Sequence, residues 1–228
     1  MLGVELDRPL INDDTFKLDY TNEGGYDNTI RLLKNIIGLW IYQECKKDWD
    51  KAGNTMSFDE LEAKASASEP FVSFINPDDD LFYSPGNMPQ KLSDYCKRTG
   101  QTVISDKAAI TRCIIESLAM KYRMTMTGLE KILGYSVPVL HIVGGGCKNR
   151  LLCQFAANAL GIPVVAGPVE ATAIGNLACQ LISLGELSGT DDAREMIKRS
   201  FPTDTYMPVD REKWDEAYFR FCKLIAKN

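Results

Sequence analysis

The sequence of 228 residues contains one histidine and no pair of cysteines spaced as CxxC. Zinc sites in proteins draw heavily on these ligands, so a zinc centre is not expected. The seven cysteines are odd in number and suit free thiols in a reducing compartment better than a disulfide framework. Cys147 lies in a glycine-rich stretch close to His141, but no paired base is apparent, which argues against a catalytic cysteine.

Long apolar runs and an excess of positive charge are absent as well. No stretch approaches the ~18 consecutive apolar residues of a membrane-spanning helix. Residues 1–4 lack the basic stretch and apolar run of a secretory signal, which predicts a cytoplasmic protein. With 26 basic and 31 acidic side chains the net charge is −5, so no nucleic-acid partner is expected. A phosphorylated ligand remains compatible, because backbone N–H groups bind phosphate without cationic side chains.

Local patterns predict the elements of the first hundred residues. In chain order they are a strand over 1–6, a turn at 22–25, a helix over 29–49, a helix over 57–67 after a capping box, a strand over 71–75, loops at 76–80 and 84–87, and a helix from 89 to 100. The aspartates at 78–80 are expected to be solvated. Because the first strand begins at Met1 without a leading segment, we expect the chain to enter in the middle of a sheet.

The rest of the chain shows clearer periodicity. It predicts a long helix over 105–133 with methionines as core filler, a buried strand over 139–143, a helix over 149–160, a strand over 162–166, and helices over 171–184 and 212–226. Two strands that alternate with helices indicate an α/β core. No internal repeat and no clear domain boundary is visible.

Three glycines, Gly144, Gly145 and Gly146, separate the strand over 139–143 from the next helix. Glycines let a flat ligand approach the backbone, and a helix N-terminus offers N–H groups and a partial positive charge. The loop is therefore a candidate site for adenosine or its phosphates. The spacing fits neither GxGxxG nor GxxxxGK[ST], so a purely structural turn is the alternative.

Three segments in this region together resemble the FGGY carbohydrate kinases. They are HIVGGGCKNRLLCQ at 141–154, AANALGIPV at 156–164 and GPVEATAIGN at 167–176. Four more segments resemble the rhamnulokinase subfamily of that family: TNEGG at 21–25, LKNIIGLW at 33–40, FINP at 74–77 and RCIIESLA at 112–119. The resemblance covers essentially the whole chain.

The resemblance implies an α/β fold of the actin-like ATPase (ribonuclease H-like) kind, with a mixed sheet flanked by helices. Members of the family have two such domains on either side of a cleft; the first binds most of the sugar and the second binds ATP. Residues 1–228 would be the C-terminal ATP-binding domain, itself incomplete, and the N-terminal sugar-binding domain would be absent.

The resemblance also implies transfer of the ATP γ-phosphoryl group, with Mg²⁺, to a ketose. For the rhamnulokinase subfamily the product would be L-rhamnulose 1-phosphate. Two alternatives stay open. One is another FGGY ketose kinase, similar to a xylulokinase or a fuculokinase; the other is a nucleotide-binding protein without catalysis.

Residue by residue, Gly145 matches a glycine whose backbone lies against adenine, with Gly144 and Gly146 beside it in the ATP-binding loop. Gln43 matches an ATP contact on the adenine side, and Asn35 matches a polar residue at the substrate end of the cleft. On the predicted helix these two would be ~12 Å apart along the axis. The family's catalytic aspartate has no counterpart here, so no catalytic residue and no metal ligand is expected in this chain.

Overall fold

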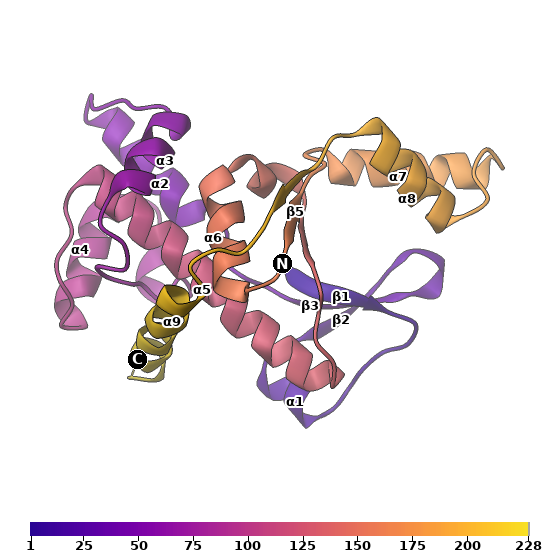
Figure 1. The fold of residues 1–228 in the computed structure, drawn as a ribbon, viewed down its shortest axis with the longest axis horizontal. Coiled ribbons are helices and arrows are strands. Elements are labelled where there is room, and N and C mark those ends of the chain that lie inside the picture. The colour runs from indigo at the N-terminus through magenta and orange to yellow at the C-terminus, as the bar shows by residue number, and fades with distance from the viewer. Residues whose placement is uncertain (228) are drawn as a thin grey trace.

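The computed structural model describes residues 1–227 as two three-stranded sheets beside a larger group of helices (Figure 1). The elements are β1 (Leu2–Leu6), α1 (Asp13–Lys17), β2 (Thr21–Gly24), η1 (Tyr26–Asn28), β3 (Ile30–Lys34), α2 (Trp40–Lys51), α3 (Phe58–Ala67), η2 (Asp80–Phe82), α4 (Met88–Arg98), α5 (Lys107–Leu133), β4 (Leu140–Ile142), η3 (Gly144–Lys148), α6 (Arg150–Leu160), β5 (Val164–Ala166), α7 (Ala171–Ser183), α8 (Thr190–Ser200), β6 (Asp204–Tyr206) and α9 (Arg211–Lys227).

The first sheet is antiparallel and has the strand order β1-β3-β2. Its central strand β3 lies where a helix over 29–49 was predicted, so the first part of that prediction is wrong. The apolar residues happen to fall at helical spacing, but pairing with β1 and β2 overrides this local preference. The helix α2 begins only after Gly38, and the predicted turn at 22–25 is also wrong because β2 occupies most of it.

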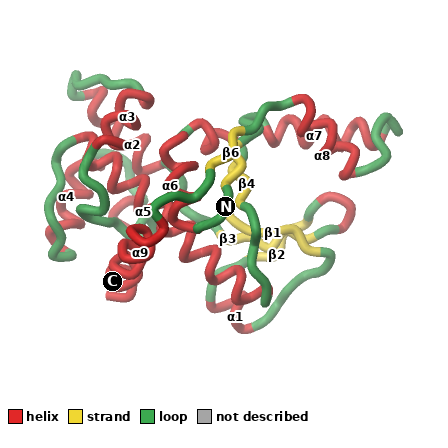
Figure 2. The backbone as a smooth tube through the Cα atoms, viewed as in Figure 1, coloured by secondary structure: helices red, strands yellow, loops and turns green. Residues whose placement is uncertain are grey.

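The second sheet has the order β4-β5-β6, with β4 parallel and β6 antiparallel to β5 (Figure 2). The strands near 140 and 164 were predicted, and both are confirmed. Burial of the first is wrong, because β4 is an edge strand whose His141 is exposed and whose neighbour Val143 is 51% exposed. The parallel pair joined by α6 confirms the α/β class.

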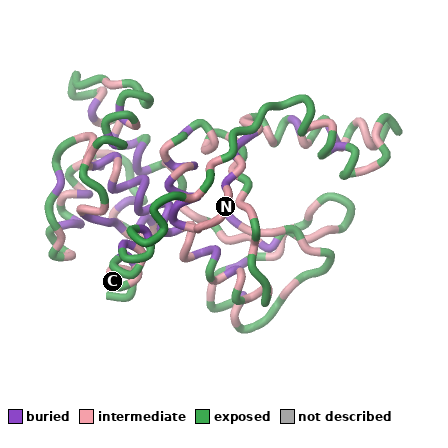
Figure 3. Tube along the Cα trace, in the orientation of Figure 1, coloured by how far each residue is buried: buried purple, intermediate pink, exposed green. Residues whose placement is uncertain are grey.

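The long helix α5 is the centre of the core. Asp106 caps its N-terminus by accepting from the backbone N–H groups of Ala108 and Ala109, and Gly134 ends it in the left-handed conformation at φ 77°. The buried residues of the chain follow α5 and α6 in Figure 3, whereas α7 and α8 form a mostly exposed arm. Met120 and Met126 are buried, which confirms their role as core filler.

The segment 71–75 is not a strand, so that prediction is wrong; Phe71 lies in a turn with a φ of 56°. Its backbone N–H groups bond to side chains in place of a neighbouring strand: Phe71 to Glu116 at 2.9 Å, Phe74 to Gln101 at 2.8 Å and Ile75 to Ser117 at 3.0 Å. These side-chain acceptors satisfy groups that a strand would pair with a partner strand.

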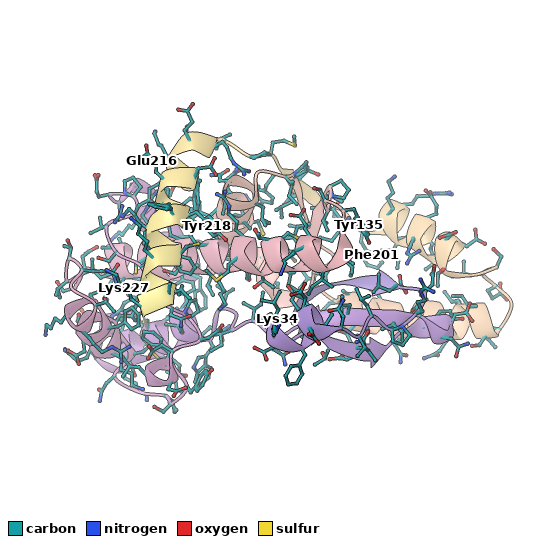
Figure 4. All side chains as sticks on the ribbon, turned by 90° about the horizontal axis from the view of Figure 1, so that it is seen from below. Lys34, Tyr135, Phe201, Glu216, Tyr218 and Lys227 are labelled. Carbon is teal, nitrogen blue, oxygen red and sulfur yellow. The ribbon has the colours of Figure 1, made fainter. Side chains whose placement is uncertain are left out.

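The helices α3, α4, α6, α7 and α9 agree with the sequence patterns, whereas α1 and α8 were not predicted. The capping box is present, since Ser57 accepts from the Glu60 N–H and the Glu60 carboxylate accepts from the Ser57 N–H. In Figure 4, Tyr218 extends from α9 towards α5, where the Arg123 guanidinium lies 4.1 Å from its ring centroid. All seven cysteines are free thiols.

The aspartates at 78–80 are not simply solvated. Asp78 forms an ion pair with Lys121 at 2.6 Å, and Asp79 pairs with Arg98 and accepts from the Leu81 N–H. Only Asp80 is exposed. These two ion pairs fix the loop to α5 and α4, which explains how an acidic run is held against the core.

Candidate functional site

A cavity of about 430 Å³ lies between α2, the first turns of α3 and the glycine loop η3. Its size is in the range of pockets for small molecules. It brings together two residues that the sequence analysis assigned to ATP, Gln43 and Gly145, although they are far apart in the chain. The lining residues are Leu39, Tyr42, Gln43, Phe58, Asp59, Glu62, Gly145, Lys148 and Asn149.

The helical wall of the cavity is aromatic with a polar rim. Tyr42 is buried, and its ring meets the Phe58 ring edge-on with 5.2 Å between the two ring centroids. The Tyr42 hydroxyl also donates a hydrogen bond to the Phe58 carbonyl oxygen at 3.4 Å. Gln43 is the next residue on α2 and is exposed, so its amide is free to meet a ligand. A wall of this kind presents apolar surface to a flat base and an amide to its polar edge.

The glycine loop forms the opposite wall. Gly144 has φ 75°, a left-handed conformation that favours glycine, and donates its N–H to the Pro168 carbonyl at 3.1 Å. A side chain added at Gly145 would meet nothing within 4 Å, so the backbone there is open to the cavity. Gly146 lies on a second cavity between β1 and β4, of about 330 Å³. Of the three glycines, only Gly145 lines the cavity with Gln43.

The N-terminus of α6 was expected to offer unpaired N–H groups, and for Leu152 that expectation is wrong. Asn149 caps the helix by accepting from the Leu152 N–H at 2.7 Å. The N–H groups of Arg150 and Leu151 lie close to the Glu62 carboxylate and partly oppose the rise that burial causes in its pKa. Because one donor is capped and a carboxylate lies beside the other two, the cavity suits the neutral part of a nucleotide better than its phosphates.

Burial shifts the acid–base behaviour of the groups around the loop. The pKa of Glu62 is raised, mainly by burial and also by the neighbouring Asp59. The pKa of the Cys147 thiol is raised by burial too, which keeps it protonated. No base is bonded to the Cys147 thiol among the residues that the structure describes, and the absence of a catalytic role stays a prediction.

Asn35 lies elsewhere than predicted. It is exposed in the loop between β3 and α2, so it shares no helix with Gln43 and does not line the same cavity. The neighbouring residues Ile36 and Gly38 line the second cavity, where Gly146 also lies. A role of Asn35 at the substrate end of a cleft stays a prediction.

Within residues 1–227, no group of three or more histidine, cysteine, aspartate or glutamate side chains could hold a metal ion. No helix in the same range is long and apolar enough to cross a membrane.

Sequence reasoning missed Tyr42, Phe58, Glu62 and Asn149 as cavity residues. The capping box did place Phe58 at the start of a helix, and Asn149 stands at a helix start directly after the glycine loop, where asparagine commonly caps. Nothing in the sequence connects Glu62 to the loop, because that contact joins residues 87 positions apart.

The chain is similar to known carbohydrate kinases. Residues 1–184 match the FGGY family of carbohydrate kinases, C-terminal domain. The chain is 48% identical over 225 residues to a rhamnulokinase of Bacteroides thetaiotaomicron, covering 99% of this chain and 46% of that protein. It is 40% identical over 224 residues to a rhamnulokinase of Pectobacterium atrosepticum, covering 98% and 44%. The chain therefore spans less than half the length of these relatives.

A solved structure shows the fold. The ligand-bound xylulose kinase of Lactobacillus acidophilus has a TM-score of 0.65 at 14% identity, over 96% of this chain and 44% of that one. Such a likeness at low identity supports the expected α/β fold of the actin-like kind, present here in part.

Proposed function

The chain belongs to the FGGY family of carbohydrate kinases, and we propose that it supplies the adenosine-binding part of an ATP-dependent rhamnulokinase. The reaction would transfer the ATP γ-phosphoryl group to L-rhamnulose and give L-rhamnulose 1-phosphate, in the cytoplasm. In this proposal residues 1–228 act as one C-terminal ATP-binding unit, and the sugar-binding domain lies outside the chain.

The observation that carries the proposal is the cavity between α2 and the glycine loop. It joins Gln43 and Gly145 across an aromatic wall, with the Gly145 backbone open to a ligand. The choice of sugar is supported by the two relatives, which are both named as rhamnulokinases.

Adenine would lie against the Gly145 backbone with its edge towards Gln43. Gly144 would set the path of the loop, and Gly146 would lie on the side that faces the second cavity. Asn35, near that second cavity, would contact the substrate end of the cleft. These assignments place the base in the cavity and direct the phosphates away from the capped N-terminus of α6.

The chemistry of phosphoryl transfer is mostly positioning and charge stabilisation, to which Mg²⁺ would supply positive charge and a carboxylate would supply the acceptor of the hydroxyl proton. No carboxylate cluster of the described residues fits a metal site. We therefore assign neither the metal nor the base to this chain; its own residues bind and orient the nucleotide.

Two experiments test the proposal. Calorimetric titration with ADP should show saturable binding to the chain, and Gln43→Ala should weaken it. A chimera that joins the unmatched part of the Bacteroides relative to this chain should phosphorylate L-rhamnulose in preference to L-fuculose and D-xylulose. Activity on another ketose would favour a different FGGY kinase. ADP binding with no activity of the chimera would favour a protein that only binds nucleotide, and no ADP binding would refute the proposal.

A further inference from the structure

Glu62 joins the helical wall of the cavity to its glycine loop. It projects from α3, whose Leu61 and Ala65 are buried in the core and so fix the orientation of the helix. Its carboxylate accepts from the Asn149 side-chain amide at 2.8 Å. The backbone N–H groups of Arg150 and Leu151 act on the same carboxylate. A single side chain of α3 thus accepts a hydrogen bond from the residue that caps α6 and lies close to the first two N–H groups of that helix.

Asn149 continues this connection to the loop. It is only 4% exposed, and its side-chain oxygen accepts from the Leu152 N–H at 2.7 Å. Its own backbone N–H donates to the Gly146 carbonyl at 3.2 Å. Because both the nitrogen and the oxygen of the Asn149 side-chain amide are hydrogen-bonded, the side chain cannot change rotamer without breaking a bond. The end of the glycine loop is bonded to the Asn149 backbone and therefore moves with it.

We propose that Glu62 is a positioning residue for the nucleotide, which holds the glycine loop at the distance from α2 that an adenine needs. The inference rests on the proposed function, since it concerns the same cavity. An ionised carboxylate is an acceptor only and suits the Asn149 amide donor and the nearby N–H groups of α6, whereas a neutral amide presents two donors of its own to them. Loss of the charge should therefore loosen the loop without removing any atom from the cavity wall.

The charge on Glu62 depends on its surroundings. Burial disfavours the ionised form, while the backbone donors of α6 favour it. Lowering the pH through the pKa of Glu62 should weaken adenosine binding in the wild type and not in a Gln variant. The other titratable or charged groups facing it are Asp59 on α3, Tyr42 on α2, Lys148 on η3, and Arg150 and Cys153 on α6.

The test compares Glu62→Gln with a matched control, Glu116→Gln. Glu116 is a buried carboxylate that accepts a side-chain N–H, as Glu62 does, and also the Phe71 N–H, but it lies on α5 away from the cavity. Adenosine is the probe, because it has no phosphate that titrates. We expect Glu62→Gln to weaken adenosine binding about tenfold, as the loss of a charged hydrogen bond would. Glu116→Gln should leave binding within twofold even if it lowers the melting temperature.

Hydrogen exchange supplies a readout that needs no ligand. Exchange at the Asn149 and Leu152 amides should speed up in Glu62→Gln and stay unchanged in Glu116→Gln. Equal exchange and equal affinity in Glu62→Gln and wild type would overturn the inference. If the wild type binds no adenosine, the proposed function fails, and the exchange rates alone decide whether Glu62 holds the loop. Should Glu62→Gln not fold, exchange of the wild type across the pH range decides the same point.

Discussion

Replacement of Gly145 by valine separates a ligand-binding loop from a structural turn. A side chain at this position would meet nothing within 4 Å, and Gly145 is not among the glycines with positive φ. The fold should therefore tolerate the substitution, and any loss of nucleotide affinity comes from the space that the new side chain takes. Gly144 is different, because its φ of 75° lies in the left-handed region, which other residues adopt only at a cost in free energy.

The size of the effect follows from the cavity. Valine adds three carbon atoms to the face where we place adenine, in a cavity of about 430 Å³. The base would have to shift off the backbone and lose much of its contact, which should weaken ADP binding at least tenfold, or ~1.4 kcal/mol. Gly145→Ala, with one added carbon, should have a smaller effect in the same direction.

Calorimetry with ADP tests the expected loss of affinity, and thermal melting tests the expected tolerance of the fold. Gly145→Val should bind ADP more weakly and melt at the wild-type temperature. Gly144→Ala should lose about 1 kcal/mol of stability and melt roughly 2–4 °C lower. A wild-type ADP dissociation constant in Gly145→Val would show that the loop is only a turn, and a large loss of stability would show that the fold does not tolerate the substitution.

Three further predictions concern activity, the loop thiol and pH. The chain alone should not phosphorylate L-rhamnulose, because the expected base and sugar domain lie outside it; a saturable rate in a coupled assay would refute this. Cys147→Ser should keep most of the turnover of an active chimera, because phosphoryl transfer needs no thiol intermediate, and iodoacetamide should react slowly at neutral pH since burial raises the pKa of Cys147. Burial raises the pKa of Glu116 to about 7, so the folded state holds a proton that the unfolded state releases. The free energy of unfolding should then fall by on the order of 3 kcal/mol as the pH rises from about 4.5 to 7. Urea denaturation of Glu116→Gln should lack this fall, and an identical pH profile would contradict the assignment.

The elements that the sequence predicted well are those with local signals at both ends. The helix α5 has an aspartate cap and a terminal glycine, and α3 has a capping box, so their limits were close to the observed ones. The region from β4 to α7 was predicted almost completely, because glycines and short apolar runs mark each change of direction there.

The elements that the sequence misplaced depend on distant partners. The residues of β3 have helical spacing, and only pairing with β1 and β2 makes them a strand. The segment 71–75 is mostly apolar, yet it begins in a turn and its N–H groups bond to side chains from α5 and from Gln101. The local sequence pattern reveals neither the strand partners of β3 nor the side-chain partners of 71–75. The secondary structure of such segments is therefore easily mispredicted from sequence.

The same distinction applies to the cavity. Gln43 and Gly145 were assigned through the family resemblance, while the residues between them had to come from the fold. The helices α3 and α6 both pack against α5, and α2 contacts it as well, so one long helix sets the distance between the two walls. Glu62 then links those walls directly through Asn149. The shape of the cavity therefore depends on the packing of α3 and α6 against α5 as much as on its glycines. A change in that packing should alter nucleotide affinity even where every lining residue is kept.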